Sequence, residues 1–282
     1  MTLCGSLRCA LVAAVMCLGV SAARAQFSYD VPYVPTPHVV VEEMLRLANV
    51  KPDDFVMDLG SGDGRILIAA VRKFGARGVG VDLDPDRIAE SVYNAQLQGV
   101  ADRVAFHRQD LFKFDIGEAT VVTMYLLPSV NMRLRPRLLR ELKPGTRIVS
   151  HDFDMEDWQP DQKSTVRKNV FLWIVPAQVG GRWRTTVALP AGERSYDIEI
   201  KQKVQEIDGL ARYDKKVAGL WNARLAGERI TFVIVDDSGP IETNLYFEGR
   251  VAGDTIAGII TRGVGADQKQ IQWRAARVAA AP

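Results

Sequence analysis

The hydrophobic residues of this chain follow two patterns, one before and one after residue 180. In the first part, short apolar runs alternate with segments whose apolar residues recur every three or four positions, which is the spacing of one helix face. The predicted strands are 55–57, 79–82, 103–107, 119–124 and 147–151, and the predicted helices are 66–71, 87–98 and 131–142. This alternation predicts a parallel, doubly wound, Rossmann-like α/β sheet, which binds ligands at the carboxyl ends of its strands.

From Gly180 onward, apolar and polar residues alternate over about eight short segments, a pattern typical of strands with one buried face. Turn signals separate the segments, for example Asp208-Gly209, Ala226-Gly227 and Gly253-Asp254. This part therefore predicts a small all-β domain, an antiparallel barrel or sandwich. We expect the α/β domain at 26–178 and the β domain at 179–282. The β part offers no nucleophile constellation or metal cluster, so its sequence predicts no ligand.

Residues 1–25 have the three parts of a secretory signal peptide. Arg8 supplies a positive start, Cys9–Val20 an apolar core, and Ala23-Arg24-Ala25 a cleavage site of small residues. The core is too short to span a bilayer comfortably, so we expect cleavage after Ala25 and no stable membrane span in the mature protein. The expected location is periplasmic or secreted.

Cleavage would change both the cysteine content and the net charge. All three cysteines lie within residues 1–25, so the mature chain would have none. Disulfides, thiolate catalysis and cysteine zinc sites are then excluded, and no metal site is expected. The full chain has 36 basic and 34 acidic residues, and the segment holds two of the arginines and no acid. The mature chain is thus balanced, and its composition gives no support for a nucleic-acid partner.

Residues 27–37 form a proline-rich arm ahead of the first predicted strand. Each proline favours extended geometry in the residue before it, so the arm is not helical. Thr36 is predicted to cap a helix that has Pro37 at its first position and an apolar face over residues 40–48. The arm is interpreted either as an N-terminal tether or as a lid over a bound ligand, and Tyr33 is the residue that we expect to act in a lid.

A glycine-rich turn, DLGSGDGR at 58–65, joins the first predicted strand to the first predicted helix. Glycines allow a tight turn and a close approach of the backbone to a ligand. The dinucleotide fingerprint Gly-x-Gly-x-x-Gly is not met, because the glycines stand at positions 60, 62 and 64 and position 65 is Arg. The turn therefore indicates a ligand other than a dinucleotide.

Polar side chains gather at the carboxyl ends of the predicted strands. They are Asp58, Asp82, Asp110, Tyr125, His151 and Asp152. Asp82 lies 18 residues beyond Gly64, where nucleotide-binding α/β folds place an acidic side chain against ribose hydroxyls. Because the carboxyl ends of parallel strands meet at one edge of a sheet, we expect these side chains to form a site.

Five motifs occur in order along the first part of the chain. They are VPYVPTP at 31–37, DLGSGDGR at 58–65, YLLP at 125–128, ELKPGTRIVSH at 141–151 and WQP at 158–160. In this combination the chain resembles the small class I lysine methyltransferases related to the ATP synthase c-subunit and adenine-nucleotide-translocase methyltransferases. The resemblance covers about residues 29–176 and does not extend to the predicted β domain.

The resemblance implies the cofactor S-adenosylmethionine (SAM). SAM carries an ammonium and a sulfonium, so an acidic residue at the start of the glycine loop suits its charge. On the family's pattern the cofactor-binding residues are Asp58, Gly60, Ser61 and Gly62 in the loop, Asp82 at the ribose and Asp110 at the adenine. The proline-rich arm around Tyr33 would close over this site.

The reaction that the resemblance implies is methyl transfer to a protein lysine. A lysine nucleophile must be neutral, so the pocket must desolvate the amine or offer a proton acceptor. The candidates for shaping that pocket are Tyr33, Tyr125, His151 and Asp152. Tyr125 as a core aromatic residue, and His151 as a hydrogen-bonded histidine at a strand end, are the alternative interpretations.

Two other functions stay open at this stage. One is a small-molecule O- or N-methyltransferase, because a substrate pocket lies mostly outside the motifs. The other is an exported binding protein that keeps the cofactor fold without turnover and uses its β domain to recognise an envelope ligand. The segment 125–128 lacks the Asn/Asp-Pro-Pro-aromatic pattern of amide and base amino methyltransferases, which argues against DNA as the acceptor.

Overall fold

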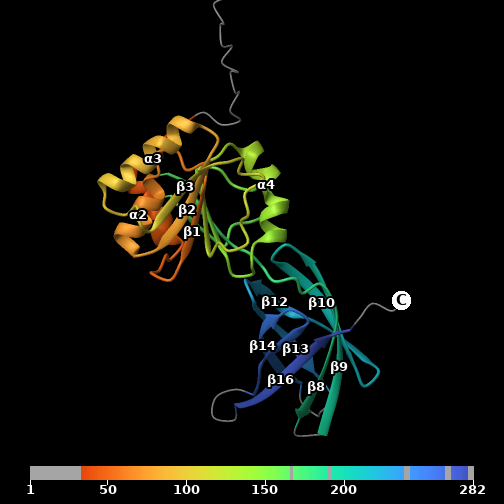
Figure 1. Ribbon diagram of the computed structural model, residues 1–282. Coiled ribbons are helices and arrows are strands. Elements are labelled where there is room, and N and C mark those ends of the chain that lie inside the picture. Colours follow the sequence, from red (N-terminus) through yellow and green to blue (C-terminus); the bar gives the residue numbers. More distant parts are fainter. Residues whose placement is uncertain (1–32, 166–167, 190–191, 238–241, 264–267, 279–282) are drawn as a thin grey trace, which may run out of the picture. The chain divides into compact units, whose positions relative to one another are not determined.

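The computed structural model describes residues 33–165, 168–189, 192–237, 242–263 and 268–278 (Figure 1). The predicted signal peptide and the arm up to residue 32 lie outside the described residues. The described strands form two sheets, one of seven strands and one of nine. Each sheet comes from one part of the sequence, and each has its own hydrophobic core.

The seven-stranded sheet has the strand order β3-β2-β1-β4-β5-β7-β6. Its strands are β1 (Phe55–Leu59), β2 (Arg77–Asp82), β3 (Val104–Arg108), β4 (Val121–Met124), β5 (Arg147–His151), β6 (Gln162–Ser164) and β7 (Val170–Ile174). The helices are α1 (His38–Leu47), α2 (Arg65–Phe74), α3 (Pro85–Leu97) and α4 (Pro128–Glu141). Strands β1 to β5 are mutually parallel, which confirms the predicted Rossmann-like α/β fold.

Strands β6 and β7 were not among the predicted elements. β7 pairs antiparallel with β5, and β6 pairs antiparallel with β7 at the edge of the sheet. The sequence of β7, VFLWI, is a continuous apolar run whose first four residues are buried. The described residues between β5 and β7 form no helix, so the alternation that revealed the five parallel strands does not extend to β7.

Helices cover both faces of this sheet. Neighbouring residues of a strand point to opposite faces, so they pack against different helices. Val56 and Val121 belong to the hydrophobic cluster that contains α1 and α2, whereas Met57 and Val122 belong to the cluster that contains α4. Figure 1 shows α2 and α4 on opposite sides of the strands. Central strands that are buried on both faces explain the uninterrupted apolar runs in the sequence.

The start of α1 differs from the prediction. Pro37, not Thr36, is the N-cap residue, and its carbonyl accepts from the backbone N–H groups of Val40 and Val41 at 2.8 and 3.0 Å. No side chain caps the helix. The Thr36 hydroxyl forms a hydrogen bond with the His151 side chain at the end of β5 instead. The predicted capping role of Thr36 was therefore wrong, because its hydroxyl bonds to a side chain 115 positions away.

The nine-stranded sheet is antiparallel throughout, in the order β11-β10-β9-β8-β16-β15-β14-β13-β12. Its strands are β8 (Gly181–Leu189), β9 (Gly192–Lys203), β10 (Glu206–Tyr213), β11 (Lys216–Gly219), β12 (Trp221–Ala226), β13 (Arg229–Asp236), β14 (Thr243–Ala252), β15 (Thr255–Arg262) and β16 (Lys269–Arg277). The Tyr213 hydroxyl of β10, near one edge of the sheet, donates to Val235 O of β13, near the other edge, at 3.2 Å. One sheet thus curls until it nearly closes, which confirms the predicted antiparallel β fold in its barrel form.

Alternate residues of these strands fill the barrel, as the sequence pattern predicted. Phe232 and Phe247 stack at 4.7 Å between ring centroids, and Trp273 meets Phe247 edge-on at 5.1 Å. Near one end of the barrel core, the Arg194 side chain is only 10% exposed. Its guanidinium forms ion pairs with Asp236 at 2.8 Å and Asp214 at 2.7 Å.

The predicted division at residues 178 and 179 stays a prediction, although it falls between β7 and β8. None of the described helices has the length and hydrophobicity that a membrane crossing requires.

Candidate functional site: the glycine loop and the adjoining strand ends

The glycine-rich turn lies between β1 and α2 and is fixed by the backbone of β2. The N–H groups of Gly60 and Ser61 both donate to Val81 O, at 2.9 and 3.0 Å. Gly60, Gly62 and Gly64 have positive φ angles of 81°, 53° and 79°. At Gly60 there is also no room for a side chain, because an added Cβ would lie 2.9 Å from Leu126 Cδ2. The loop therefore needs glycine for its conformation, and at all three positions a side chain would also crowd a neighbouring side chain.

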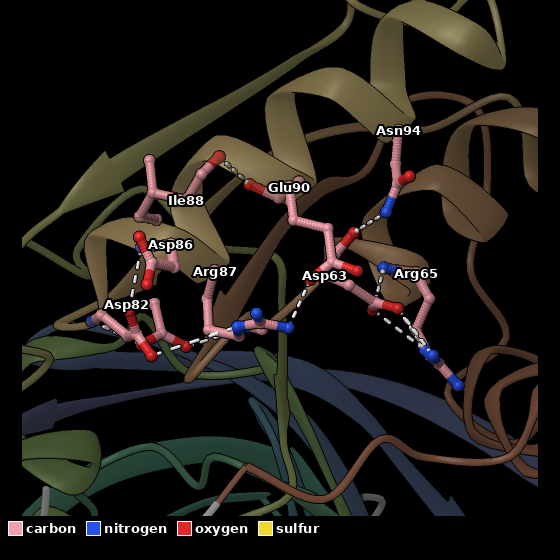
Figure 2. Close-up of polar contacts among 11 residues, drawn as sticks. Asp63, Arg65, Asp82, Asp86, Arg87, Ile88, Glu90 and Asn94 are labelled. Atoms are coloured by element: carbon pink, nitrogen blue, oxygen red, sulfur yellow. Dashed lines mark hydrogen bonds and ion pairs between the residues drawn. The ribbon is translucent and has the colours of Figure 1, made fainter.

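Asp82, at the end of β2, fixes the same loop through its side chain (Figure 2). One carboxylate oxygen accepts from the backbone N–H of Gly62 at 3.0 Å, and the other accepts from the N–H of Asp84 at 2.9 Å. The predicted Asp82 thus lies at the predicted glycine loop. A carboxylate oxygen has more than one lone pair, so Asp82 can still accept from a ligand hydroxyl.

Asp63 and Arg65 hold the loop from its other side (Figure 2). The Arg65 guanidinium binds the Asp63 carboxylate through Nε and Nη2, with a shortest distance of 2.6 Å. Asn94 of α3 donates to Asp63 O at 3.0 Å. Burial would raise the pKa of Asp63, but the Arg65 charge and hydrogen bonds outweigh it and hold that pKa below its usual range. Sequence reasoning missed this pair, although the Asp-x-Arg spacing within the motif was visible.

Asp58 and Ser61 place unpaired polar atoms in the site. Thr123 of β4 donates to Asp58 Oδ1 at 2.6 Å, whereas Asp58 Oδ2 is buried without a hydrogen-bond partner among the described residues. The Ser61 hydroxyl is buried and unpartnered in the same sense. Burial raises the pKa of Asp58 to about 7, and the negative charges of Asp82 and Asp63 add to that rise, whereas the Thr123 bond opposes it. Such a buried oxygen is suited to a cationic ligand group, because a cation favours the ionised carboxylate.

Tyr33 of the proline-rich arm lies against the glycine loop. A Cβ added at Gly62 would be 2.7 Å from Tyr33 Cε2, and the Arg87 guanidinium of α3 lies 4.5 Å from the centroid of the Tyr33 ring. The side of the ring away from these contacts faces solvent, since Tyr33 is 45% exposed. Burial, followed by the charge of Asp63, raises the pKa of Tyr33. This contact brings Tyr33 to the predicted cofactor loop.

Tyr125, His151 and Asp152 gather at the ends of β4 and β5. The rings of Tyr125 and His151 lie 3.9 Å apart between centroids, and His151 Nε2 lies 3.6 Å from Asp152 Oδ2. Asp152 adopts a positive φ of 62°, which is unusual for a residue with a side chain. Lys168 Nζ lies 3.4 Å from the same Asp152 oxygen. The three predicted residues thus form one cluster, and His151 is bonded to Thr36, which the sequence did not suggest.

Asp110 stands apart from these contacts. It follows β3 at the sheet edge, and its carboxylate accepts from the N–H of Phe112 at 2.9 Å and lies 3.9 Å from Lys113 Nζ. Its connection to the other predicted residues is indirect, because the N–H of the preceding residue, Gln109, donates to Asp82 O at 3.1 Å. The predicted adenine contact stays a prediction. Among the described residues, no group of three or more His, Cys, Asp or Glu side chains could hold a metal ion.

A glycine loop after β1, an acidic residue at the end of β2 that holds that loop, and an antiparallel β7 beside β5 define a class I, SAM-dependent methyltransferase domain. The family model described as "ANTKMT methyltransferase domain" matches residues 58–162. A protein-lysine N-methyltransferase from Saccharolobus islandicus is 46% identical over 151 residues, which are 51% of this chain and 94% of that relative. The chain belongs to this family of SAM-dependent methyltransferases.

Other relatives match over a smaller share of their own length. The adenine nucleotide translocase lysine N-methyltransferase of Mus musculus is 38% identical over 49% of this chain, and the match covers 59% of that protein. The chain thus spans little more than half of this relative. A crystal structure described as an RNA methyltransferase from Salinibacter ruber in complex with S-adenosyl-L-homocysteine shares 54% identity. That likeness has a TM-score of 0.51 and covers 52% of this chain and 96% of the other.

Replacing Asp82 with alanine is expected to weaken SAM binding by about 1–3 kcal/mol, a factor of roughly 5 to 150, because a hydrogen bond to a charged acceptor is lost. The substitution also removes the carboxylate oxygen that accepts from the Gly62 N–H. Calorimetric titration of SAM measures the change. Asp86→Ala is the matched control, since Asp86 is exposed on the first turn of α3 and offers only its backbone N–H to Asp84. An unchanged affinity in Asp82→Ala would show that Asp82 does not contact the ribose.

Proposed function

We propose that this protein transfers a methyl group from SAM to the side-chain amine of a protein lysine. The observation that carries the proposal is the unpaired, buried Asp58 Oδ2 beside the glycine loop, in a chain 46% identical to a protein named as a lysine methyltransferase. SAM supplies an electrophilic methyl group on a sulfonium. Asp58, Ser61 and Asp82 are the residues that would hold it, because their free acceptors suit its ammonium and hydroxyl groups.

The cluster at the ends of β4 and β5 suits an amine acceptor. The rings of Tyr125, His151 and Phe153 pack together, which supplies aromatic surroundings that can desolvate an entering amine. The Asp152 carboxylate already has an amine, that of Lys168, at 3.4 Å. A lysine that enters beside it would be partly desolvated by the rings, which lowers the pKa of the amine, whereas the Asp152 carboxylate opposes that shift. The same carboxylate is the acceptor for the proton that the ammonium must lose before it attacks the methyl group.

RNA is the second candidate acceptor, because the relative from Salinibacter ruber is described as an RNA methyltransferase. The balanced charge of residues 26–282 favours protein over nucleic acid, since RNA binding normally requires a basic face. We therefore propose a protein acceptor without a nucleic-acid partner. A small molecule is the third candidate acceptor, and the experiment below includes it.

Methyl-labelled SAM separates these acceptors. The full-length protein and its form beginning at Gln26 are each incubated with an envelope protein extract, total RNA and the small-molecule fraction of the same cells. We expect label in protein, on lysine after hydrolysis, and at least tenfold less label with Asp82→Ala. Label confined to RNA or to small molecules would overturn the lysine proposal. If no SAM binding is detected at concentrations up to about 1 mM, the affinity is negligible and the methyltransferase function itself is overturned.

We also propose that the protein is exported to the periplasm or secreted. The support is the order of charge, apolar core and small-residue site over residues 1–25, which lie outside the described part of the chain. N-terminal sequencing of protein recovered from the envelope is expected to begin at Gln26. Protein that keeps Met1 and is found in the cytosol would contradict export.

A further inference from the structure

Thr36 connects three parts of the site. Its hydroxyl lies 3.1 Å from His151 Nδ1, with Thr36 4% and His151 2% exposed. Its carbonyl accepts from Arg65 Nη1 at 3.0 Å, and the same guanidinium binds Asp63 in the glycine loop. Thr36 thus joins the proline-rich arm to the cofactor loop and to the end of β5. Its hydroxyl does not serve α1, which starts without a side-chain cap.

The groups around His151 decide which ring nitrogen carries the proton. Asp152 lies on the Nε2 side at 3.6 Å, Thr36 bonds Nδ1, and the Tyr125 ring lies 3.9 Å away between centroids. Lys168 Nζ lies 3.4 Å from Asp152 Oδ2. A carboxylate close to Nε2 favours a proton on that nitrogen, which leaves Nδ1 as an acceptor for the Thr36 hydroxyl.

The ring is neutral at neutral pH. Burial lowers the pKa of His151 below its usual value, and the positive charge of Lys168 adds to that effect, whereas Asp152 opposes it. A neutral imidazole has one N–H and one lone pair, and a hydroxyl can pair with either. The Asp152 carboxylate near Nε2 favours the proton on that nitrogen, and the Thr36 hydroxyl then stabilises this tautomer by donating to the lone pair of Nδ1. The tautomer in turn decides whether Asp152 meets an N–H or a lone pair.

We propose that Thr36 is a positioning residue: by donating to His151 Nδ1 it keeps the imidazole proton on Nε2, facing Asp152, so that the Asp152 carboxylate stays oriented toward the acceptor amine. This inference rests on the proposed lysine methylation for its kinetic consequence, but not for the tautomer. It assigns the arm a role in the acceptor pocket in addition to the contact of Tyr33 with the glycine loop. The Lys168 amine lies 3.4 Å from the same carboxylate, which is an amine–carboxylate ion-pair distance.

Two variants test the role of the hydroxyl. Thr36→Val keeps the shape and removes the hydroxyl, and Thr36→Ser keeps the hydroxyl and removes the methyl group. The first measurement is the ¹⁵N NMR spectrum of the His151 ring in protein that also carries His38→Gln and His107→Gln, which removes the two other histidines, both exposed. We expect a proton on Nε2 with Thr or Ser at position 36. With Val we expect a mixture of tautomers or a shifted His151 pKa.

The second measurement is methyl transfer to the labelled protein acceptor. We expect Thr36→Val to lower kcat about tenfold or more, with KM changed less than threefold, because a buried acceptor loses its partner. Thr36→Ser should stay within about threefold of the natural protein. Affinity for SAM should change less than threefold in both, because the Arg65 contact uses the backbone carbonyl.

The outcomes are distinguishable. If Thr36→Val keeps the same tautomer and pKa as Thr36→Ser, the positioning role is overturned, whatever the activity. Equal loss of kcat in both variants would also overturn it, since the hydroxyl that Ser retains would then make no difference to the reaction. If no protein acceptor is labelled at all, the proposed function fails, and the NMR result alone decides this inference. A thermal melt of each variant confirms that it is folded.

Discussion

Replacing Asp58 with asparagine is expected to stabilise the ligand-free protein at pH 8 by up to about 4 kcal/mol, and to weaken SAM binding about 10- to 100-fold. Burial raises the pKa of this carboxyl from 3.8 to about 7, so at pH 8 the folded protein carries a charge that its surroundings disfavour. Asparagine has the shape of the protonated acid without that charge. The same charge is what the ammonium of SAM is expected to bind.

The stability of the folded protein should fall as the pH rises, because of the raised pKa of Asp58. Because the folded protein holds the Asp58 proton more tightly than the unfolded chain does, the stabilising contribution is complete below about pH 4 and is lost as the pH rises through about 7. Urea unfolding at pH 5 and pH 8, with and without SAM, measures this. The natural protein should lose more stability over that interval than Asp58→Asn, and Asp86→Asn, on the surface, should follow the natural protein. An asparagine variant that is less stable at pH 8 and binds SAM normally would contradict the proposed role of Asp58 as a buried carboxylate that binds the ammonium of SAM.

Replacing Arg194 with alanine is expected to destabilise the barrel by about 3–5 kcal/mol, because it leaves a buried carboxylate without its cation. Asp236 has a side chain only 7% exposed and forms its 2.8 Å ion pair with this guanidinium, which is itself 10% exposed. The second partner, Asp214, is 59% exposed and adds less. Burial acts to lower the pKa of Arg194, but its interactions with Tyr196 and Asp236 outweigh burial and raise that pKa.

Arg184→Ala is the matched control for that experiment. Arg184, on the neighbouring strand β8, pairs with Asp197 at the same 2.7 Å as the Arg194–Asp214 pair, but both side chains are more than half exposed. Exposed pairs contribute less than about 1 kcal/mol. Urea unfolding followed by circular dichroism should therefore separate the two variants by at least about 2 kcal/mol. Equal effects would mean that Arg194 is not a buried structural cation.

The parallel part of the sheet could be predicted because its signal is local. Apolar runs such as 55–57 and 119–124 end at polar residues, and the glycine spacing at 60, 62 and 64 identified the loop before any contact was known. The acidic residues beside that loop, Asp58 and Asp82, were predicted for the same reason. β7 was missed because it joins the sheet antiparallel and without a helix before it.

The contacts of Thr36 and Arg65 could not be predicted, because they depend on which distant residues the fold brings together. Thr36 before Pro37 has the local sequence of a helix cap, yet its hydroxyl lies beside a histidine 115 positions away. A hydrogen-bonding side chain takes the better buried partner when one is near, and the sequence alone does not say where that partner is. The same limit applies to Asp110, whose distance from a bound adenine no pattern reveals.

The separate cores of the two sheets provide natural optical reporters of unfolding. Trp158 and Trp173 lie in the core of the seven-stranded sheet, whereas Trp183 and Trp273 lie in that of the barrel. The fifth tryptophan, Trp221, is 62% exposed, so its emission would add a background that changes little on unfolding. With Trp221 and one pair changed to phenylalanine, the fluorescence of the remaining pair would tell whether the two cores melt in a single transition or in succession.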